Sequence, residues 1–262
     1  MINFDRVADI YDETRGLPPG MDERIMEAIV AATHAEPDTR FLELGIGTGR
    51  VALPFVRHGY AYTGVDISEQ MMNVLRDKVG PEARNLELIT GDVAHLPQAD
   101  GSVDVVLAVH LLHLVPNVRV VLQEVQRVLA PMGHLVVAGN DTVPDDPRRE
   151  IQGQWREFVQ QAGVELPSNE RGQTPGQTEL WEMGAQTTVF HVGSWARPFR
   201  PADLLQEQRD RVFSLSWSVP DDVLEQVDHQ MQDWVNTRYG SADVELETRQ
   251  EFLLSVSQFP QE

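Results

Sequence analysis

A cluster of glycines with a carboxylate in front of it is the feature of this sequence best suited to chemistry on a bound ligand. The cluster follows the apolar run Phe41–Leu44, which is typical of a strand, and precedes a helical pattern over residues 50–58. Glycine allows a positive φ and a close approach of backbone to ligand, and a helix start offers free N–H groups. The cluster therefore predicts a binding loop, although a tight strand–helix turn also uses glycine. Its members are Gly45, Gly47, Thr48 and Gly49, after Glu43.

Two further carboxylates stand at the ends of the next two strand-like runs. Asp66 ends the run that starts at Tyr62, and Asp92 follows Leu86–Thr90. The carboxyl ends of parallel strands meet at one edge of an open sheet, where ligands bind. There Asp66 can accept both ribose hydroxyls of a nucleoside, Asp92 can accept an adenine amino group, and Val93 can donate its N–H to the ring. A helix cap and a turn are the alternative interpretations of the two aspartates.

Residues 47–52 also satisfy the dinucleotide pattern GxGxx(G/A). Two features argue against a nicotinamide or flavin. Glu43 lies inside the first strand, where dinucleotide folds usually carry an apolar residue, and Gly45 precedes the formal motif. A sulfonium ligand lacks phosphate but has an α-amino group, from which Glu43 can accept a hydrogen bond directly or through water. A nicotinamide oxidoreductase is the alternative, and Glu43→Ala distinguishes the two because it would barely affect a dinucleotide.

A histidine follows the fourth strand-like run, Val103–Val109. Its place at the same sheet edge makes His110 the candidate catalytic residue, either as a general base or as a group that orients the acceptor. A structural or pocket-lining histidine is the alternative. His113 stands three residues later, a spacing that can hold a metal on a helix. No third ligand is evident, so the sequence predicts no metal site.

The charge of the chain limits its partners. Its 262 residues carry 21 basic and 41 acidic side chains, a net charge of −20, and no cysteine. A polyanion is repelled by nucleic acid and by anionic lipid, so we expect neither nucleic acid nor a membrane as partner. No apolar run reaches the ~18 residues of a membrane helix. The polar start MINFDRVADIYDE is no signal peptide, so the cytoplasm is the expected location.

The alternation of strand-like and helical runs predicts the fold class. Through residues 1–140 short loops separate strands from helices, the pattern of a parallel, doubly wound α/β sheet. We expect residues 1–140 to form a cofactor-binding core with N-terminal helices. Residues 141–262 would add the last sheet strands and helical lid or substrate insertions to the same domain, with an exposed loop over 163–178. The expected strands are 41–44, 62–65, 86–90, 103–109, 134–138, 187–195 and 251–259, and the expected helices are 50–58, 69–79, 118–129, 149–162, 201–211 and 220–238.

Five segments together match one family in order and spacing. They are Phe41–Arg50 (FLELGIGTGR), Thr63–Ser68 (TGVDIS), Gly91–Pro97 (GDVAHLP), Ser102–Leu107 (SVDVVL) and Glu124–Val137 (EVQRVLAPMGHLVV). These segments resemble the class I S-adenosylmethionine-dependent methyltransferases. Tyr11–Gly16 (YDETRG) also resembles the opening segment of the small-molecule branch related to the ubiquinone and menaquinone C-methyltransferases.

The resemblance implies a Rossmann-like fold with a seven-stranded, mostly parallel sheet whose last strand is antiparallel. It also implies S-adenosylmethionine as cofactor and S-adenosylhomocysteine as product. The glycines of residues 45–49 would then pass under the methionine part, Asp66 would hold the ribose, and Asp92 the adenine amine.

Three more residues gain an expected position from the resemblance. Met71 would pack on the adenine, with plain helix core as the alternative, and Tyr11 and Arg15 would fold over the cofactor. The sequence also departs from the family. Met132 stands where Pro-Gly-Gly is usual, which changes a turn. No Asn/Asp-Pro-Pro-Tyr/Phe follows the fourth strand, which argues against methylation of adenine, cytosine or glutamine amides.

The function expected from this combination is methyl transfer from S-adenosylmethionine to a small-molecule acceptor. A methyltransferase-like module that binds the cofactor without transfer, or a protein methyltransferase, are the alternatives, with a nicotinamide oxidoreductase ranked last. The acceptor and the oligomeric state are not readable from the sequence, because one fold serves many substrates.

Overall fold

The computed structural model describes residues 4–81, 83–166 and 176–260. The chain divides into two compact units. The first comprises Met1–Gly139, Gly172–Gly193 and Phe252–Glu262, and the second comprises Asn140–Arg171 and Ser194–Glu251. The division falls within three strands of the sheet.

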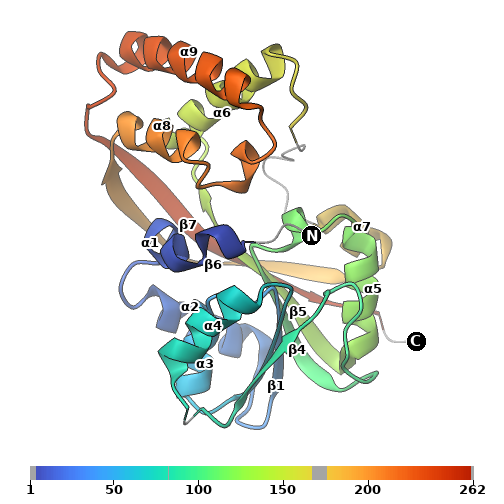
Figure 1. The fold of residues 1–262 in the computed structure, drawn as a ribbon. Helices are drawn as coiled ribbons and strands as arrows, with labels where there is room; N and C mark the ends of the chain where they lie inside the picture. The colour runs from blue at the N-terminus through green and yellow to red at the C-terminus, as the bar shows by residue number, and fades with distance from the viewer. Residues whose placement is uncertain (1–3, 82, 167–175, 261–262) are drawn as a thin grey trace. The chain divides into compact units, whose positions relative to one another are not determined.

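One seven-stranded sheet has the strand order β3-β2-β1-β4-β5-β7-β6 (Figure 1). The five strands from β3 to β5 pair in parallel. Their order reverses at β1 and β4, as in a doubly wound sheet, so the expected α/β fold class is confirmed. The strands are β1 (Arg40–Leu44), β2 (Ala61–Asp66), β3 (Leu86–Thr90), β4 (Val103–Val109), β5 (Leu129–Thr142), β6 (Gln186–Phe199) and β7 (Leu246–Gln258).

Helices of the first unit cover both faces of its part of the sheet. In Figure 1, α2, α3 and α4 lie on one side, and α5 and α7 lie on the other. Two helix starts carry side-chain caps, since Ser68 accepts the N–H of Met71 and Asn117 accepts the N–H of Val120. The bounds are η1 (Asp5–Ile10), α1 (Tyr11–Arg15), α2 (Met21–Thr33), α3 (Ala52–Arg57), α4 (Glu69–Val79), η2 (Leu112–Leu114), α5 (Val118–Val128) and α7 (Gln177–Glu182).

Alternation along β1 decides which residues face the site. Leu42 and Leu44 are fully buried and belong to the core that includes the apolar face of α5. Phe41 and Glu43 point the other way, because successive side chains of a strand alternate. Phe41 stacks on Tyr62 of β2, with ring centroids 5.8 Å apart. This alternation puts the Glu43 carboxyl on the same face as the Tyr62 ring.

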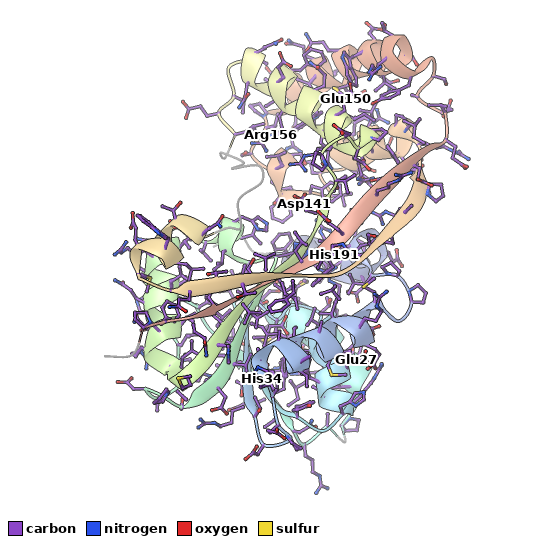
Figure 2. The ribbon with its side chains drawn as sticks, turned by 180° about the vertical axis from the view of Figure 1, so that it is seen from behind. Glu27, His34, Asp141, Glu150, Arg156 and His191 are labelled. Atoms are coloured by element: carbon purple, nitrogen blue, oxygen red, sulfur yellow. The ribbon has the colours of Figure 1, made fainter. Side chains whose placement is uncertain are left out.

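The second unit has its own helical core. Its helices are α6 (Pro147–Gln161), α8 (Pro201–Arg209), η3 (Ser214–Ser216) and α9 (Asp221–Tyr239). Glu150 of α6 (Figure 2) accepts hydrogen bonds from Arg238 and Tyr239 at the end of α9, at 2.9 and 2.6 Å. Buried side chains of the three α-helices fill the space between them: Ile151, Trp155, Val159, Leu204, Leu205, Leu224, Val227, Met231 and Val235.

Several elements differ from the sequence-based expectation. Strand β6 ends at Phe199 rather than at 195, and β7 begins at Leu246 rather than at 251. Strand β5 begins at Leu129 rather than at 134, because the residue that caps α5 is already extended and Met132 takes a turn at φ +66° inside the strand. Helix α7 was not expected, and it starts within the predicted loop over 163–178. Residues 167–175 of that loop lie outside the described residues. None of the described helices is long and apolar enough to cross a membrane.

Candidate cofactor site

The parallel strands bring the predicted residues to one edge of the sheet. Glu43 pairs in register with Gly64 of β2 and with Leu107 of β4. Asp66 is the last residue of β2 and pairs with Thr90, the last residue of β3. The carboxyl ends of β1 to β4 therefore gather the glycine loop, Asp66, Asp92 and His110 within the first unit.

The glycine loop requires glycine at the positions where it passes over neighbouring side chains. Gly45 has φ +64°, and a Cβ there would lie 2.7 Å from Leu111 Cδ1. Gly47 has φ +54°, and a Cβ there would lie 3.2 Å from Met71 Cε. Met71, predicted to line an adenine, is buried and packs beneath this loop. The loop thus presents bare backbone at the sheet edge.

Asp66 fixes the glycine loop from the end of β2. Its Oδ2 accepts the Gly47 N–H and its Oδ1 accepts the Ser68 N–H, both at 2.8 Å. Burial raises the pKa of Asp66, and the hydrogen bonds from these two N–H groups partly offset that effect. The Ile67 N–H also bonds this carboxylate. A carboxylate has about four lone-pair sites, so Asp66 can still accept a further donor, such as a hydroxyl.

Glu43 is a buried carboxyl inside the sheet. Its exposed fraction is 3%, and its Oε2 accepts a 2.7 Å hydrogen bond from the Tyr62 hydroxyl. Burial raises the pKa of Glu43 to about 8, although the hydrogen bond from Tyr62 and the charge of Arg50 act in the opposite direction. A cationic ligand beside this carboxyl would favour its ionised form.

The segment after β3 carries Asp92 and Val93. Asp92 is exposed, and one of its oxygens accepts the Ala94 N–H at 3.0 Å, which closes a tight turn. Val93 is fully buried, so its side chain anchors the turn in the core. The turn leaves the second carboxylate oxygen of Asp92 without a hydrogen bond in the part of the chain that the structure describes.

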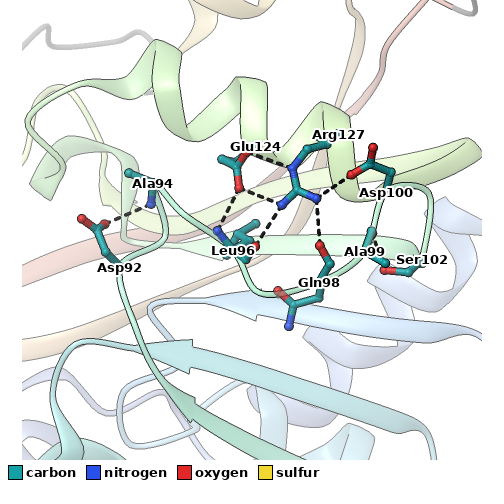
Figure 3. A network of polar contacts seen from close by, with 9 residues as sticks. All are labelled: Asp92, Ala94, Leu96, Gln98, Ala99, Asp100, Ser102, Glu124 and Arg127. Carbon is teal, nitrogen blue, oxygen red and sulfur yellow. Dashed lines mark hydrogen bonds and ion pairs between the residues drawn. The ribbon is translucent and has the colours of Figure 1, made fainter.

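Arg127 of α5 ties the rest of this segment down (Figure 3). Its guanidinium donates to the carbonyl oxygens of Leu96 and Gln98 and to the carboxylates of Glu124 and Asp100, at 2.7–2.9 Å. Glu124 in turn accepts the Leu96 N–H at 2.8 Å. A planar guanidinium with all its donors used holds the loop rigidly, and this loop begins at the turn that contains Asp92.

His110 follows β4 with an unusual backbone. Its φ is +51°, and its N–H donates to the Ala138 carbonyl of β5 at 3.0 Å. A Cβ on Gly139 would lie 2.9 Å from His110 Cε1, so the imidazole packs against a residue that has no side chain. Positive φ is uncommon outside glycine, and such strained residues cluster at functional sites.

The N-terminal segment packs on the residue that follows the glycine loop. The guanidinium carbons of Arg15 and Arg50 lie 4.7 and 5.3 Å from the centroid of the Tyr11 ring. Arg50 also donates a hydrogen bond to the Arg15 carbonyl. Tyr11 and Arg15 are therefore placed beside the loop. Thr48, a buried residue of the loop, donates a hydrogen bond to Asp12 at 2.6 Å.

Sequence reasoning missed several residues that support this site. Tyr62 was taken only as a strand residue, although a buried tyrosine hydroxyl needs a partner and Glu43 was the nearby candidate. The contacts of Asp12, Arg50 and Lys78 carry no local signal, since they join positions at least 30 residues apart. Among the described residues, no group of three or more His, Asp or Glu side chains could hold a metal ion.

The chain is similar to proteins named as methyltransferases. Residues 42–137 match the family model described as methyltransferase domain. The chain is 36% identical over 137 residues to a demethylmenaquinone methyltransferase of Renibacterium salmoninarum, covering 52% of this chain and 56% of the relative. The chain spans less than two thirds of the length of the demethylmenaquinone methyltransferases that it matches.

Two further proteins are similar over more of their length. A malonyl-[acyl-carrier protein] O-methyltransferase of Halorhodospira halophila is 29% identical over 243 residues, covering 84% of this chain and 80% of that protein. The crystal structure of the YcgJ protein from Bacillus subtilis superposes with a TM-score of 0.59 at 18% identity, covering 92% of this chain and all of that one. At this identity the structural similarity establishes the fold alone.

Proposed function

We propose that this chain, whose residues 42–137 match a methyltransferase domain, is a class I S-adenosylmethionine-dependent methyltransferase that transfers a methyl group to a small-molecule acceptor. One observation carries the proposal. Three carboxyl groups, those of Glu43, Asp66 and Asp92, stand at or near the carboxyl ends of three neighbouring strands, and the glycine loop follows the first of these strands.

The donors and acceptors at this edge fit the cofactor. Asp66 keeps acceptor capacity beyond its backbone hydrogen bonds, so it can accept from the ribose hydroxyls. Asp92 has an oxygen that can accept the adenine amine. Tyr62 bonds only Oε2 of Glu43, so Oε1 can accept a hydrogen bond from the α-ammonium group. The glycine loop lets the backbone approach the ligand closely, and the apolar side chain of Met71 packs beneath the loop.

The chemistry that the cofactor supplies when bound is a methyl group activated by a positive sulfur. The protein then needs chiefly to position an acceptor in line with that methyl group. His110 is suited to orient the acceptor or to take a proton from it at a ring nitrogen, because it follows β4 at the same sheet edge. Its backbone has a positive φ and is held by the hydrogen bond to the Ala138 carbonyl, which fixes the position from which the imidazole projects.

We further propose that the acceptor is a small molecule rather than nucleic acid. The net charge of −20 opposes a polyanionic substrate, because each phosphate would approach a surface of the same sign. The relatives whose names specify quinone or acyl-carrier substrates motivate a screen over phenols, quinols, carboxylates and amines.

The test is calorimetric titration with S-adenosylmethionine, S-adenosylhomocysteine and NADH, followed by transfer of a labelled methyl group to that panel. We expect micromolar binding of the first two ligands, no binding of NADH, and labelled product from at least one acceptor class. Glu43→Gln should weaken the sulfonium ligand at least tenfold. Glu87→Gln, the same change at an exposed site on β3, should not.

Each contrary outcome has a distinct meaning. Binding of NADH alone would make residues 47–52 a dinucleotide motif and would overturn the proposal. Cofactor binding without transfer to any small molecule or protein would leave a binding module.

A further inference from the structure

The only lysine of this chain joins the N-terminal segment to the glycine loop. Lys78 lies near the end of α4, and it is the single lysine among 21 basic residues. Its Nζ donates one hydrogen bond to Asp12 of α1 and another, of 2.7 Å, to the Thr48 carbonyl. The Thr48 hydroxyl in turn donates a 2.6 Å hydrogen bond to Asp12. The three residues therefore form a closed triangle of hydrogen bonds.

The triangle constrains the loop at its centre. Thr48 is 1% exposed and stands between two glycines with positive φ, Gly47 and Gly49. Lys78 fixes the Thr48 carbonyl and Asp12 fixes its hydroxyl, so the peptide between the glycines has little freedom to rotate. The backbone on the other side is held by the Gly47 N–H bond to Asp66. The loop is thus tied from both α4 and the N-terminal segment.

Two other ties join the same segment to the site. Asp5 accepts a hydrogen bond from Ser68, which caps α4, and Arg50 donates to the Arg15 carbonyl. Those ties hold the ends of the segment, whereas the bond of Lys78 to Asp12 holds its middle, next to Tyr11. The side chains of Lys78 and Asp12 are 27% and 36% exposed. The ion pair is therefore partly shielded, yet the amine is within reach of reagents in solution.

We propose that Lys78 is a positioning residue for the cofactor, which holds the N-terminal segment closed on the glycine loop through Asp12 and Thr48. This inference rests on the proposed function for the identity of the ligand. A ligand that binds better to the closed arrangement stabilises it by mass action, so cofactor and triangle favour each other. Replacing Lys78 should therefore weaken cofactor binding, although Lys78 itself is not among the residues proposed to contact the cofactor.

The variant series isolates that effect. Lys78→Met should raise the dissociation constant of S-adenosylhomocysteine about tenfold, as expected for loss of a charge-assisted hydrogen-bond pair. Lys78→Arg should restore most of the affinity, because a guanidinium can also donate to two acceptors. Arg76→Met is the matched control, since Arg76 bonds only within its own helix, to Asn73, in the described residues. A purely structural lysine would lower the melting temperature and leave the affinity unchanged.

The single lysine also gives a direct chemical readout. An N-hydroxysuccinimide acetate ester can modify only Lys78 and the α-amino group, and mass spectrometry separates the two peptides. Saturating S-adenosylhomocysteine should slow modification of Lys78 severalfold and leave the α-amino rate as the internal reference. Equal rates with and without a ligand that calorimetry shows to bind, or equal affinities of wild type and Lys78→Met, would overturn the proposal.

Failure of the proposed function gives a different pattern. If the wild type binds no S-adenosylhomocysteine, the cofactor assignment fails. Hydrogen exchange without ligand then tests whether the triangle holds the N-terminal segment on the glycine loop. Faster hydrogen exchange over residues 4–16 in Lys78→Met than in Arg76→Met would show that the triangle holds the N-terminal segment, so that it could serve another ligand. Equal exchange rates in the two variants would overturn the proposed role of the triangle as well.

Discussion

The Tyr62 hydroxyl donates a 2.7 Å hydrogen bond to Glu43 Oε2, and both side chains are buried between the sheet and its helices. The two residues come from adjacent parallel strands and share one face of the sheet. Burial disfavours the charge on either partner, so the pKa of Glu43 rises to about 8 and that of Tyr62 rises well above its usual value. The two side chains therefore form one buried, coupled pair on this face of the sheet.

The pH dependence of stability follows from this pair. The pKa of Glu43 is about 8 in the folded chain and about 4.5 when unfolded. Its contribution to stability is therefore fully present below pH 4.5 and is lost as pH rises through 8. The difference in unfolding free energy between wild type and Glu43→Gln should change with pH, by at most about 1.4 kcal/mol per unit. Urea denaturation at pH 5, 7 and 9 measures it, and a difference independent of pH would contradict the assignment.

Removal of the Tyr62 hydroxyl should act on the same proton. The hydrogen bond from Tyr62 favours the ionised form of Glu43, so Tyr62→Phe should raise the pKa of Glu43 further. The affinity for S-adenosylhomocysteine, which we propose to bind the ionised form, should then fall about tenfold per unit of added pKa at pH 7. The loss should be smaller at pH 9, where more of the carboxyl is ionised. Calorimetry at both pH values checks this, and an equal loss at both would indicate a packing effect instead.

Asp66 should matter for the loop as well as for the ligand. Asp66→Ala removes the acceptor of the Gly47 and Ser68 N–H groups and the proposed partner of the ribose. We expect the affinity for S-adenosylmethionine to fall by roughly 1.5–3 kcal/mol, with a loss of unfolding free energy of similar size. Titration well below the melting temperature separates the two effects. An unchanged affinity would reject the assignment of Asp66 to the site.

The loop that begins at Asp92 should depend on Arg127. Arg127→Met removes donors to two backbone carbonyls and two carboxylates, which should cost about 2–4 kcal/mol of unfolding free energy. Arg119→Met on the same helix breaks only an exposed ion pair with Glu182 and should cost less than about 1 kcal/mol. Paired denaturation curves compare them, and equal costs would mean that the loop does not depend on the network.

Local patterns were enough to predict the parallel part of the sheet. Each strand from β1 to β4 is a short apolar run closed by turn residues, and its bounds depend on neighbours within a few positions. The glycine loop, Asp66 and Asp92 were found in the same way, because each directly follows such a run. Strand β5 was predicted too short, since Leu129 already pairs with Val103 of β4, before a register irregularity after which pairing resumes at His134.

Contacts between distant segments could not be predicted. Asp12 meets Thr48 and Lys78 only after α1 folds back on the loop, and none of these residues has a pattern that names its partner. The pairing of Tyr62 with Glu43 needed the register of β1 against β2, which periodicity alone does not fix. The sequence thus predicted which residues lie at the carboxyl ends of β1 to β4 better than it predicted the contacts that hold them in place.

Met132 occupies a turn position that favours glycine. Its φ is +66° and its side chain is 67% exposed, so the left-handed backbone is not offset by burial. An L-residue in this region costs roughly 1–2 kcal/mol, part of which glycine loses again through its freedom in the unfolded chain. Met132→Gly should therefore stabilise the protein by about 0.5–1 kcal/mol. Thermal and urea unfolding measure the gain.

The neighbouring glycine provides the opposite control. Gly133 has no positive φ, and a Cβ there would lie 2.9 Å from the Ala130 carbonyl oxygen and 3.0 Å from that of Asp104. Gly133→Ala should destabilise the protein, because backbone atoms of two strands would have to move apart. Met132→Ala keeps the Cβ in the left-handed region, so it should give none of the gain. A stability of Met132→Gly at or below that of Met132→Ala would show that the turn carries no strain that glycine relieves.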